Sequence, residues 1–192
     1  MIFYNTFFRK VVTYDLINAF TYQSVPQIPK LKKIVLNFGY SKSSLKYLMS
    51  GLLALEFISL KKGKLTKSKN LNLLLKIKKG NPVGCKVILK KNSMYFFYFK
   101  LITSIFPKIK QSQMPQFLWN LKVIKAITFQ LKSPLLFTEL ENQFQFFKSI
   151  PRLDITICTD SWTQKEFFFF LKSIKFITAN VTQFGRVWSC QD

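Results

Sequence analysis

The sequence predicts an α+β fold, a single domain in which a mainly antiparallel sheet packs against helices. Segments with helical spacing of apolar residues and short segments with alternating spacing follow one another irregularly along the 192 residues. A loop signal bounded by two glycines, Gly80-Asn81-Pro82-Val83-Gly84, stands between two basic alternating segments and predicts a hairpin. Hydrophobic residues make up 48% of the chain, which is enough apolar material for a packed core.

A helix is predicted near the start of the chain, and a strand and a second helix follow it. Asn5 can cap the first helix, which ends at a proline-rich segment, 25–29, because the residue before a proline disfavours helix. From Leu31 to Phe38 the apolar period changes to two, which predicts a strand, and helical spacing returns from Leu45 to Leu55. The apolar positions are Phe8, Val12, Leu16, Ala19 and Phe20 in the first helix and Ile34, Leu36 and Phe38 in the strand.

The middle of the chain is predicted to form a hairpin and a buried helix. Leucines alternate with other residues from Leu71 to Ile77, and apolar residues alternate with lysines from Cys85 to Lys90. Both patterns are typical of strands, so the Gly80–Gly84 segment would be the loop between them. Ser93 can cap a helix from Met94 to Phe106.

Two more strands and a closing helix are expected in the last third of the chain. Apolar patterns predict strands from Ile124 to Leu131 and from Leu153 to Thr159. Ser161 or Thr163 can cap a helix that runs to about Phe176. Residues 177–192 have no clear period, so we divide the chain into a domain, 1–176, and a C-terminal tail, 177–192.

The charge balance indicates a polyanionic partner. Lys and Arg number 30 against 8 Asp and Glu, a formal net charge of +22, and a compact body with that charge repels itself unless a polyanion lies against it. Nucleic acid and an anionic membrane are the two candidates. The most apolar segment, Met94 to Phe106, contains Lys100 and is too short to span a bilayer. The densest lysines lie on predicted strands and loops rather than on an amphipathic helix, which favours nucleic acid. They are Lys61, Lys62, Lys64, Lys67, Lys69, Lys76, Lys78, Lys79, Lys86, Lys90 and Lys91.

The residue types argue against an enzyme and against a metal or other cofactor. The chain has no His, which removes the usual general base and the usual neutral metal ligand. Cys85, Cys158 and Cys190 are odd in number and widely separated, so neither a zinc site nor a disulfide framework is expected. We expect these cysteines to be reduced and mostly buried.

The few acids do not form a catalytic motif. Glu139 and Glu141 are the only close acidic pair, and no third acid or His accompanies them. Asp154 lies inside an apolar strand pattern and needs a partner, which Arg152 or a backbone amide could supply. The alternative function, an organelle-encoded nucleic-acid enzyme such as an intron maturase or endonuclease, would need two or three convergent acids to hold Mg²⁺.

Several segments resemble, in the same order, the family of large-subunit ribosomal protein number five. Residues 25–39, VPQIPKLKKIVLNFG, are similar to its V-x-x-V-P-x-x-x-K-I-V-L-N-M-G opening. Residues 76–89, KIKKGNPVGCKVIL, are similar to its K-I-R-x-G-x-P-I-G-C-K-V-T-L block, and 153–157, LDITI, match the D-I-T-I motif. Shorter similarities lie at 65–69 and at 101–110, whereas the D-F-R-G-L segment expected after Lys110 is replaced.

The resemblance implies an α+β domain of the central protuberance that binds 5S rRNA, or large-subunit rRNA where 5S rRNA has been lost. It also implies a loop that faces the elbow of P-site tRNA, contacts with neighbouring central-protuberance proteins and an intersubunit bridge to a small-subunit head protein. The rRNA-binding residues that it implies are Lys33, Asn37, Thr66, Lys67 and Lys69. The tRNA-facing loop that it implies contains Lys76, Lys78, Lys79, Gly80, Asn81, Pro82 and Gly84.

Composition and drift from the family pattern indicate a ribosome of the mitochondrial matrix rather than a plastid. Arg9, Arg152 and Arg186 are the only arginines, whereas Lys, Phe, Ile and Asn are abundant, as an AT-rich gene would produce. The first helix of the family pattern begins near Met1, which leaves no room for a cleavable presequence. We therefore expect the gene to be translated inside the organelle.

Overall fold

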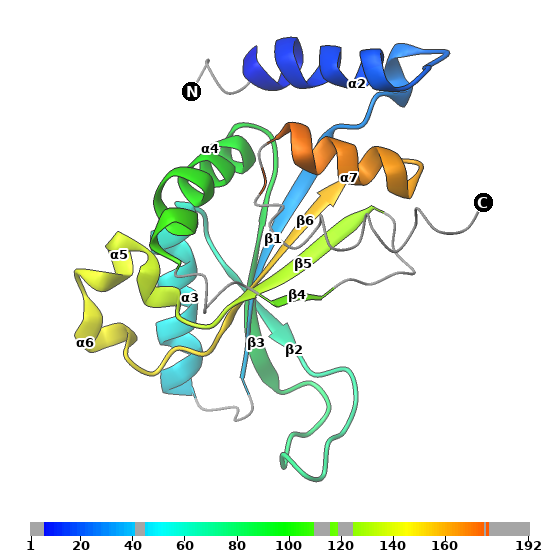
Figure 1. Cartoon of the computed structure of the whole chain (residues 1–192). Helices are drawn as coiled ribbons and strands as arrows, with labels where there is room; N and C mark the ends of the chain where they lie inside the picture. The colour runs from blue at the N-terminus through cyan, green and yellow to red at the C-terminus, as the bar shows by residue number, and fades with distance from the viewer. Residues whose placement is uncertain (1–5, 41–44, 110–115, 119–124, 175, 177–192) are drawn as a thin grey trace.

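The computed structural model describes residues 6–40, 45–109, 116–118, 125–174 and 176, and these form one α+β domain, as predicted (Figure 1). Its centre is a six-stranded sheet in the order β2-β3-β1-β6-β5-β4, in which every neighbouring pair is antiparallel. The strands are β1 (Leu31–Gly39), β2 (Lys64–Lys67), β3 (Pro82–Leu89), β4 (Gln116–Leu118), β5 (Ala126–Leu131) and β6 (Leu153–Thr159).

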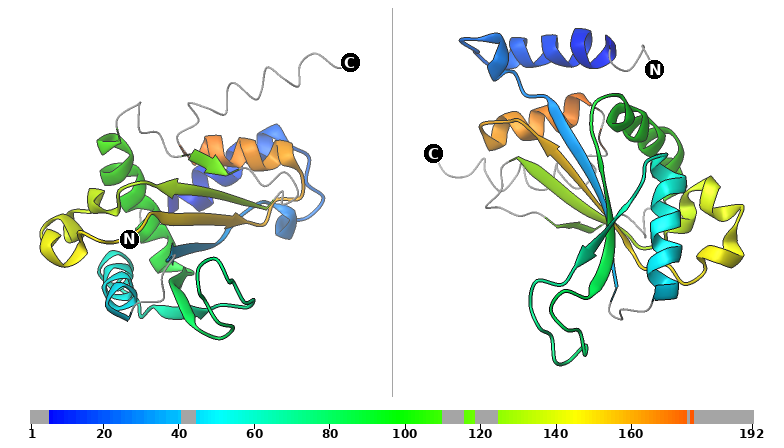
Figure 2. Two further views of the ribbon diagram at one scale, coloured as in Figure 1. Left: turned by 90° about the horizontal axis from the view of Figure 1, so that it is seen from below. Right: turned by 180° about the vertical axis from the view of Figure 1, so that it is seen from behind.

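The helices pack on one side of the sheet and across one of its ends (Figures 1 and 2). The two views agree that α2 lies along α7 at this end, whereas the connection between β2 and β3 extends from the other end. The helices are α2 (Thr13–Ala19), α3 (Leu45–Ser59), α4 (Asn92–Lys100), α5 (Thr138–Glu141), α6 (Phe144–Phe147) and α7 (Gln164–Ser173). A π-helical turn precedes α2 (Phe8–Val12), and another follows α4 (Leu101–Ile105).

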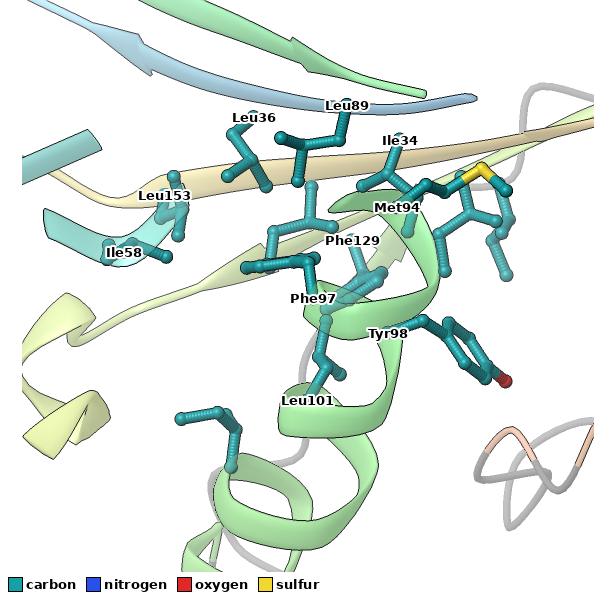
Figure 3. Close-up of a cluster of buried hydrophobic side chains, with 14 of the residues drawn as sticks. Ile34, Leu36, Ile58, Leu89, Met94, Phe97, Tyr98, Leu101, Phe129 and Leu153 are labelled. Atoms are coloured by element: carbon teal, nitrogen blue, oxygen red, sulfur yellow. The ribbon is translucent and has the colours of Figure 1, made fainter. Parts of the chain in front are cut away.

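Strict alternation along the strands produces the core. Ile34, Leu36 and Phe38 of β1 are fully buried, and their neighbours Val35 and Asn37 are only half-buried. Side chains of α4 point toward this buried face, as Figure 3 shows for Met94 and Phe97 near Ile34 and Leu36. The other strands contribute Cys85, Val87, Leu89, Ile127, Phe129, Leu131, Leu153, Ile155 and Ile157 to the same cluster.

Most predicted elements are confirmed, with differences at their caps. The closing helix α7 begins after Thr163, whose hydroxyl accepts a hydrogen bond from the Glu166 backbone, while the Glu166 carboxylate accepts one from the Thr163 backbone. The predicted Ser93 cap is wrong: α4 already begins at Asn92, and Lys91 before it has a left-handed φ of 54°. The predicted Asn5 cap and the tail 177–192 lie outside the described residues. The sequence patterns did not predict β4, α5 or α6.

The strand predicted from Leu71 to Ile77 is wrong, and so is the hairpin loop at Gly80–Gly84. Strand β2 lies earlier, at Lys64–Lys67, and residues 68–81 form its connection to β3, whose first residues are Pro82, Val83 and Gly84. An alternating pattern becomes a strand only where a neighbouring strand and a packing surface are available. Residues 71–77 extend beyond the end of the sheet, and all four of their leucines are exposed.

No helix in the described part of the chain combines the length and the apolar character that crossing a membrane requires.

We expect Phe97→Ala to lower the free energy of unfolding by about 3–5 kcal/mol, because it removes a large ring from the core. Phe97 is 1% exposed and stacks on Phe137 with ring centroids 6.2 Å apart. Phe96→Ala is the matched control on the same helix, since Phe96 is 42% exposed, and we expect it to cost less than about 1 kcal/mol. Chemical denaturation of both variants measures the difference, and equal costs would contradict this description of the core.

Candidate RNA-binding surface

A groove of about 860 Å³ opens where β1, β2 and β3 meet the connection 68–81. Asn37 and Gly39 of β1 form one side, Thr66 of β2 and Gly84 of β3 form the floor, and the connection forms the other side. The residues that line it are Asn37, Phe38, Gly39, Tyr40, Thr66, Ser68, Lys69, Asn70, Leu71, Asn72, Leu75, Ile77, Val83 and Gly84.

Gly84 is buried at the floor of the groove and permits β3 to lie close to its two neighbours, β1 and β2. A Cβ atom at this position would lie 2.6 Å from the Phe38 carbonyl oxygen and 2.7 Å from the Thr66 hydroxyl. Both distances are far inside van der Waals contact, so any side chain here would push the neighbouring strands apart. Gly84 is therefore required to keep the polar groups of Thr66 and Asn37 at one site.

The structure brings three of the five predicted rRNA-binding residues together. Asn37, Thr66 and Lys69 line the groove, although they come from three separate segments of the chain. Lys67 is exposed next to it, at the bulge where β2 pairs with Pro82. Lys33 lies on the same face of β1 as Asn37 but toward the other end of the strand, opposite Cys158.

The groove continues into the face of the sheet that the described helices leave uncovered, which we call the open face. In register, Asn37 lies between Lys86 of β3 and Asp154 of β6, and Asp154 lies opposite Gln130 of β5. Lys86 is in turn opposite Lys64 of β2, so charged and amide side chains cross five neighbouring strands in one row. The other members of the open face are Lys33, Val35, Ile88, Ala126, Thr128, Thr156 and Cys158.

The expectation that Arg152 or a backbone amide partners Asp154 is not confirmed by an interaction in the structure. Asp154 is half-buried, and the ion pairs found among the described residues do not include it. Its place in the row between Asn37 and Gln130 could not be read from the sequence, because strand register depends on which segments pair.

The connection 68–81 is an ordered hairpin of its own. Asn72 and Ile77 exchange two backbone hydrogen bonds of 3.0 Å, and the Asn72 side chain accepts a third from Leu75. At the base, the Ser68 backbone N–H donates to Asn81 and its carbonyl accepts from Gly80. These bonds hold the turn from Leu73 to Lys76 in place, and Lys76 there has a φ of 52°.

The tip of this hairpin is apolar, and its arms are basic. Leu73 and Leu74 are 80% and 95% exposed, whereas Ile77 is buried and anchors the arm. The predicted tRNA-facing residues Lys76, Lys78, Lys79 and Gly80 lie exposed along the tip and one arm. The remaining three lie toward its base: Asn81 and Pro82 are half-buried, and Gly84 belongs to the groove. Sequence reasoning missed the leucine tip because it assigned these leucines to a strand.

The lysines of this region have no acids among them. From Lys61 to Lys91 the sequence contains eleven lysines and no Asp or Glu. In the structure all of them are exposed except the half-buried Lys61. The carboxylate nearest in sequence, Glu56, accepts a hydrogen bond from the Gly63 backbone. The groove and the hairpin therefore present unbalanced positive charge, which suits phosphate.

The two close glutamates are held by separate lysines rather than joined in one site. Lys100 lies 2.6 Å from Glu139, and its ammonium also lies over the Phe137 ring. Burial acts to raise the pKa of Glu139, but hydrogen bonds from Lys100 and from the Glu139 backbone hold the pKa below its ordinary value. Glu141 pairs with Lys108 at 3.7 Å. Within the described residues, no three His, Cys, Asp or Glu side chains are grouped as a metal site would need.

The described cysteines are free thiols, as expected. Cys85 is buried, donates to the Leu48 carbonyl at 3.3 Å, and has its pKa raised to about 11 by that burial. Cys158 is half-buried on the open face, where burial likewise raises its pKa. Cys190 lies outside the described residues.

No protein-family model matches the chain, but curated proteins do. The chain is 33% identical over 161 residues to the large ribosomal subunit protein uL5m of Reclinomonas americana, covering 83% of this chain and 88% of that protein. It is 34% identical over 173 residues to the large ribosomal subunit protein uL5 of Wigglesworthia glossinidia brevipalpis, with 88% and 95% covered. The uL5 protein of Malacoplasma penetrans is 34% identical over 172 residues, with 87% and 89% covered.

We expect Glu139→Gln to destabilise the fold near neutral pH and to have no effect in acid. Because the folded-state pKa is depressed, the stabilisation is present above the ordinary pKa and is lost as the pH falls through the depressed value. The Glu139 side chain is 38% exposed, so solvent screening limits the effect to about 1 kcal/mol or less. Chemical denaturation across the acid range measures it. Glu141→Gln is the control, and a Glu139→Gln cost that persists in acid would contradict this assignment.

Proposed function

The chain belongs to the uL5 family of large ribosomal subunit proteins, and from that premise we propose that it binds 5S rRNA through the groove and the open face of its sheet. Its relatives are structural ribosomal proteins and not enzymes, so the chain is a structural component of the large subunit. The alternative of a nucleic-acid enzyme is thereby wrong. Where a ribosome lacks 5S rRNA, the same surface would bind large-subunit rRNA.

The observation that carries the proposal is the convergence of Asn37, Thr66 and Lys69 on one groove. An amide and a hydroxyl can exchange hydrogen bonds with base edges and ribose hydroxyls, and lysines can neutralise the flanking phosphates. Lys67 and Lys86 extend the positive charge on either side of that groove. Lys33, farther along the open face, would contact a neighbouring part of the same RNA.

The hairpin 68–81 is proposed to contact the elbow of P-site tRNA. It projects past the end of the sheet, its backbone is closed by its own hydrogen bonds, and Leu73 and Leu74 at its tip are largely exposed. A preorganised tip with lysines along its arm can touch a passing RNA without the entropy cost of folding around it. Gly80 and Pro82 at its base support this, since Gly80 takes a φ of 88° and proline is rigid.

The remaining proposals concern the setting of the protein. Its side away from the groove would meet a small-subunit head protein at an intersubunit bridge and neighbouring proteins of the central protuberance. Exposed apolar side chains there support a protein contact, among them Met49 and Leu53 of α3. We place the protein in the mitochondrial matrix, as the product of an organellar gene, a setting that the uL5m relative supports.

The groove is tested by Lys69→Ala, which should weaken binding of 5S rRNA and lower the steepness of its salt dependence by about one phosphate contact. Lys148→Ala is the matched control, because it removes the same charge from an exposed site after α6. Filter binding over a salt series measures both. Equal effects of the two changes, or a salt slope near zero in the unaltered protein, would contradict the proposal.

The hairpin is tested by the double change Lys78→Ala and Lys79→Ala. We expect weaker retention of P-site tRNA on ribosomes and normal incorporation of the protein into the large subunit, because the groove is left intact. Lys90→Ala with Lys91→Ala is the matched control, since this adjacent exposed pair lies past the other end of β3. If subunits that contain the Lys78→Ala and Lys79→Ala variant retain P-site tRNA normally, the proposed contact between the hairpin and tRNA is wrong.

A further inference from the structure

We propose that Trp162 is a stacking platform for an unpaired RNA base, at the end of the sheet opposite the groove. The proposal rests on the proposed function, because it requires an RNA partner. It differs from the groove in place and in chemistry: the groove offers hydrogen bonds and charge, whereas this site offers an aromatic surface.

Trp162 is exposed to solvent on a fixed backbone. It is 68% exposed, which is costly for so large an apolar ring unless a partner covers it. Its backbone N–H and that of Thr163 both donate to the Glu166 carboxylate at 3.1 Å, and the Thr163 hydroxyl accepts from the Glu166 backbone at 3.3 Å. The backbone of Trp162 is therefore held in place before any ligand binds, which lowers the entropy cost of stacking.

A lysine lies over the Trp162 ring, and the two acids near it in sequence already have partners. The Lys125 ammonium lies 5.1 Å from the ring centroid, and the Thr159 N–H donates to the Lys125 carbonyl at 2.7 Å, which ties this lysine to the end of β6. The Asp160 carboxylate forms an ion pair with Lys32 at 3.5 Å, and the Asp160 backbone N–H donates a hydrogen bond to the Lys30 carbonyl. Glu166 is engaged by the two backbone donors described above. Lys125 is thus the lysine that the structure places against the ring, and the ion pairs found among the described residues do not include it.

This combination fits an unpaired base in a phosphate chain. Every base has a face that can stack on indole, and the Lys125 ammonium at the ring can take a flanking phosphate. A base inside a duplex has no free face, so the ligand must be single-stranded or flipped out. A membrane fits poorly, because the residues next to Trp162 in sequence, Ser161 and Thr163, are polar rather than apolar.

The platform and the groove contact different nucleotides. Leu31 of β1 pairs with Thr159, close to Trp162, whereas Gly39 of β1 pairs with Gly84 at the floor of the groove. Eight residues of strand separate the two ends, which is about 26 Å at roughly 3.3 Å per residue. Figure 1 shows the corresponding arrangement, with α7 at one end of the sheet and the hairpin at the other.

The test uses the full chain with Trp119→Phe and Trp188→Phe, which leaves Trp162 as its one tryptophan. A short oligoadenylate should quench its emission strongly, and an abasic oligomer of the same length should not. In the same background, Trp162→Ala should weaken oligoadenylate binding about tenfold, and Trp162→Phe should restore most of it, because a phenyl ring also stacks. Circular dichroism confirms that the exposed-site variants fold.

Binding of 5S rRNA to the same proteins separates the two proposals. Equal quenching by the abasic oligomer would reduce the site to a charge contact and overturn the platform. No quenching in a chain that still binds 5S rRNA would overturn the platform alone. Quenching by oligoadenylate in a chain that fails to bind 5S rRNA would overturn the assignment of 5S rRNA to the groove and keep the platform.

Discussion

The register of β1 against its two neighbours is the constraint on which the rest of the molecule depends. β1 lies between β3 and β6, and its alternation sends Ile34, Leu36 and Phe38 into the core while Lys33, Val35 and Asn37 face outward. A slip of one residue would exchange the two faces, burying an amide and a lysine and exposing the core. The apolar face that holds the helices and the polar face proposed for RNA are thus two results of one pairing.

The second constraint is the unbalanced positive charge of one part of the chain. Eleven lysines between Lys61 and Lys91 have no acid among them, and the ion pairs found in the described residues, such as Lys100 with Glu139, lie elsewhere. Lys100 with Glu139 and Lys108 with Glu141 tie α5 to the segment that contains α4, and the ion pairs found among the described residues include no lysine of the hairpin or the groove. A bound polyanion relieves the repulsion that remains, so folding stability and RNA binding are coupled in this chain.

Local pattern was sufficient for elements whose two faces differ in polarity. Residues 31–38 and 153–159 could be assigned from their own alternation, and the cap of the closing helix could be narrowed to Ser161 or Thr163, of which the structure has Thr163. Pattern failed at 71–77, where leucines alternate but nothing packs on them. The groove itself could not be derived from spacing, because it joins Asn37, Thr66 and Lys69 through pairing of distant segments. These residues were predicted from the resemblance to the family, because the family pattern marks residues that strand pairing brings together. The spacing of residues in a single sequence does not show that pairing.

The leucine tip has a consequence for the life of the protein before assembly. Leu71, Leu73 and Leu74 are exposed to solvent, and β2 is an edge strand of the sheet. A newly made chain therefore exposes both an apolar patch and a row of unpaired backbone N–H and C=O groups. Such a surface favours self-association, and the rate of self-association rises with the concentration of unassembled copies of the chain. Synthesis of the chain must therefore be matched to the supply of nascent subunits, with the surplus left to proteases.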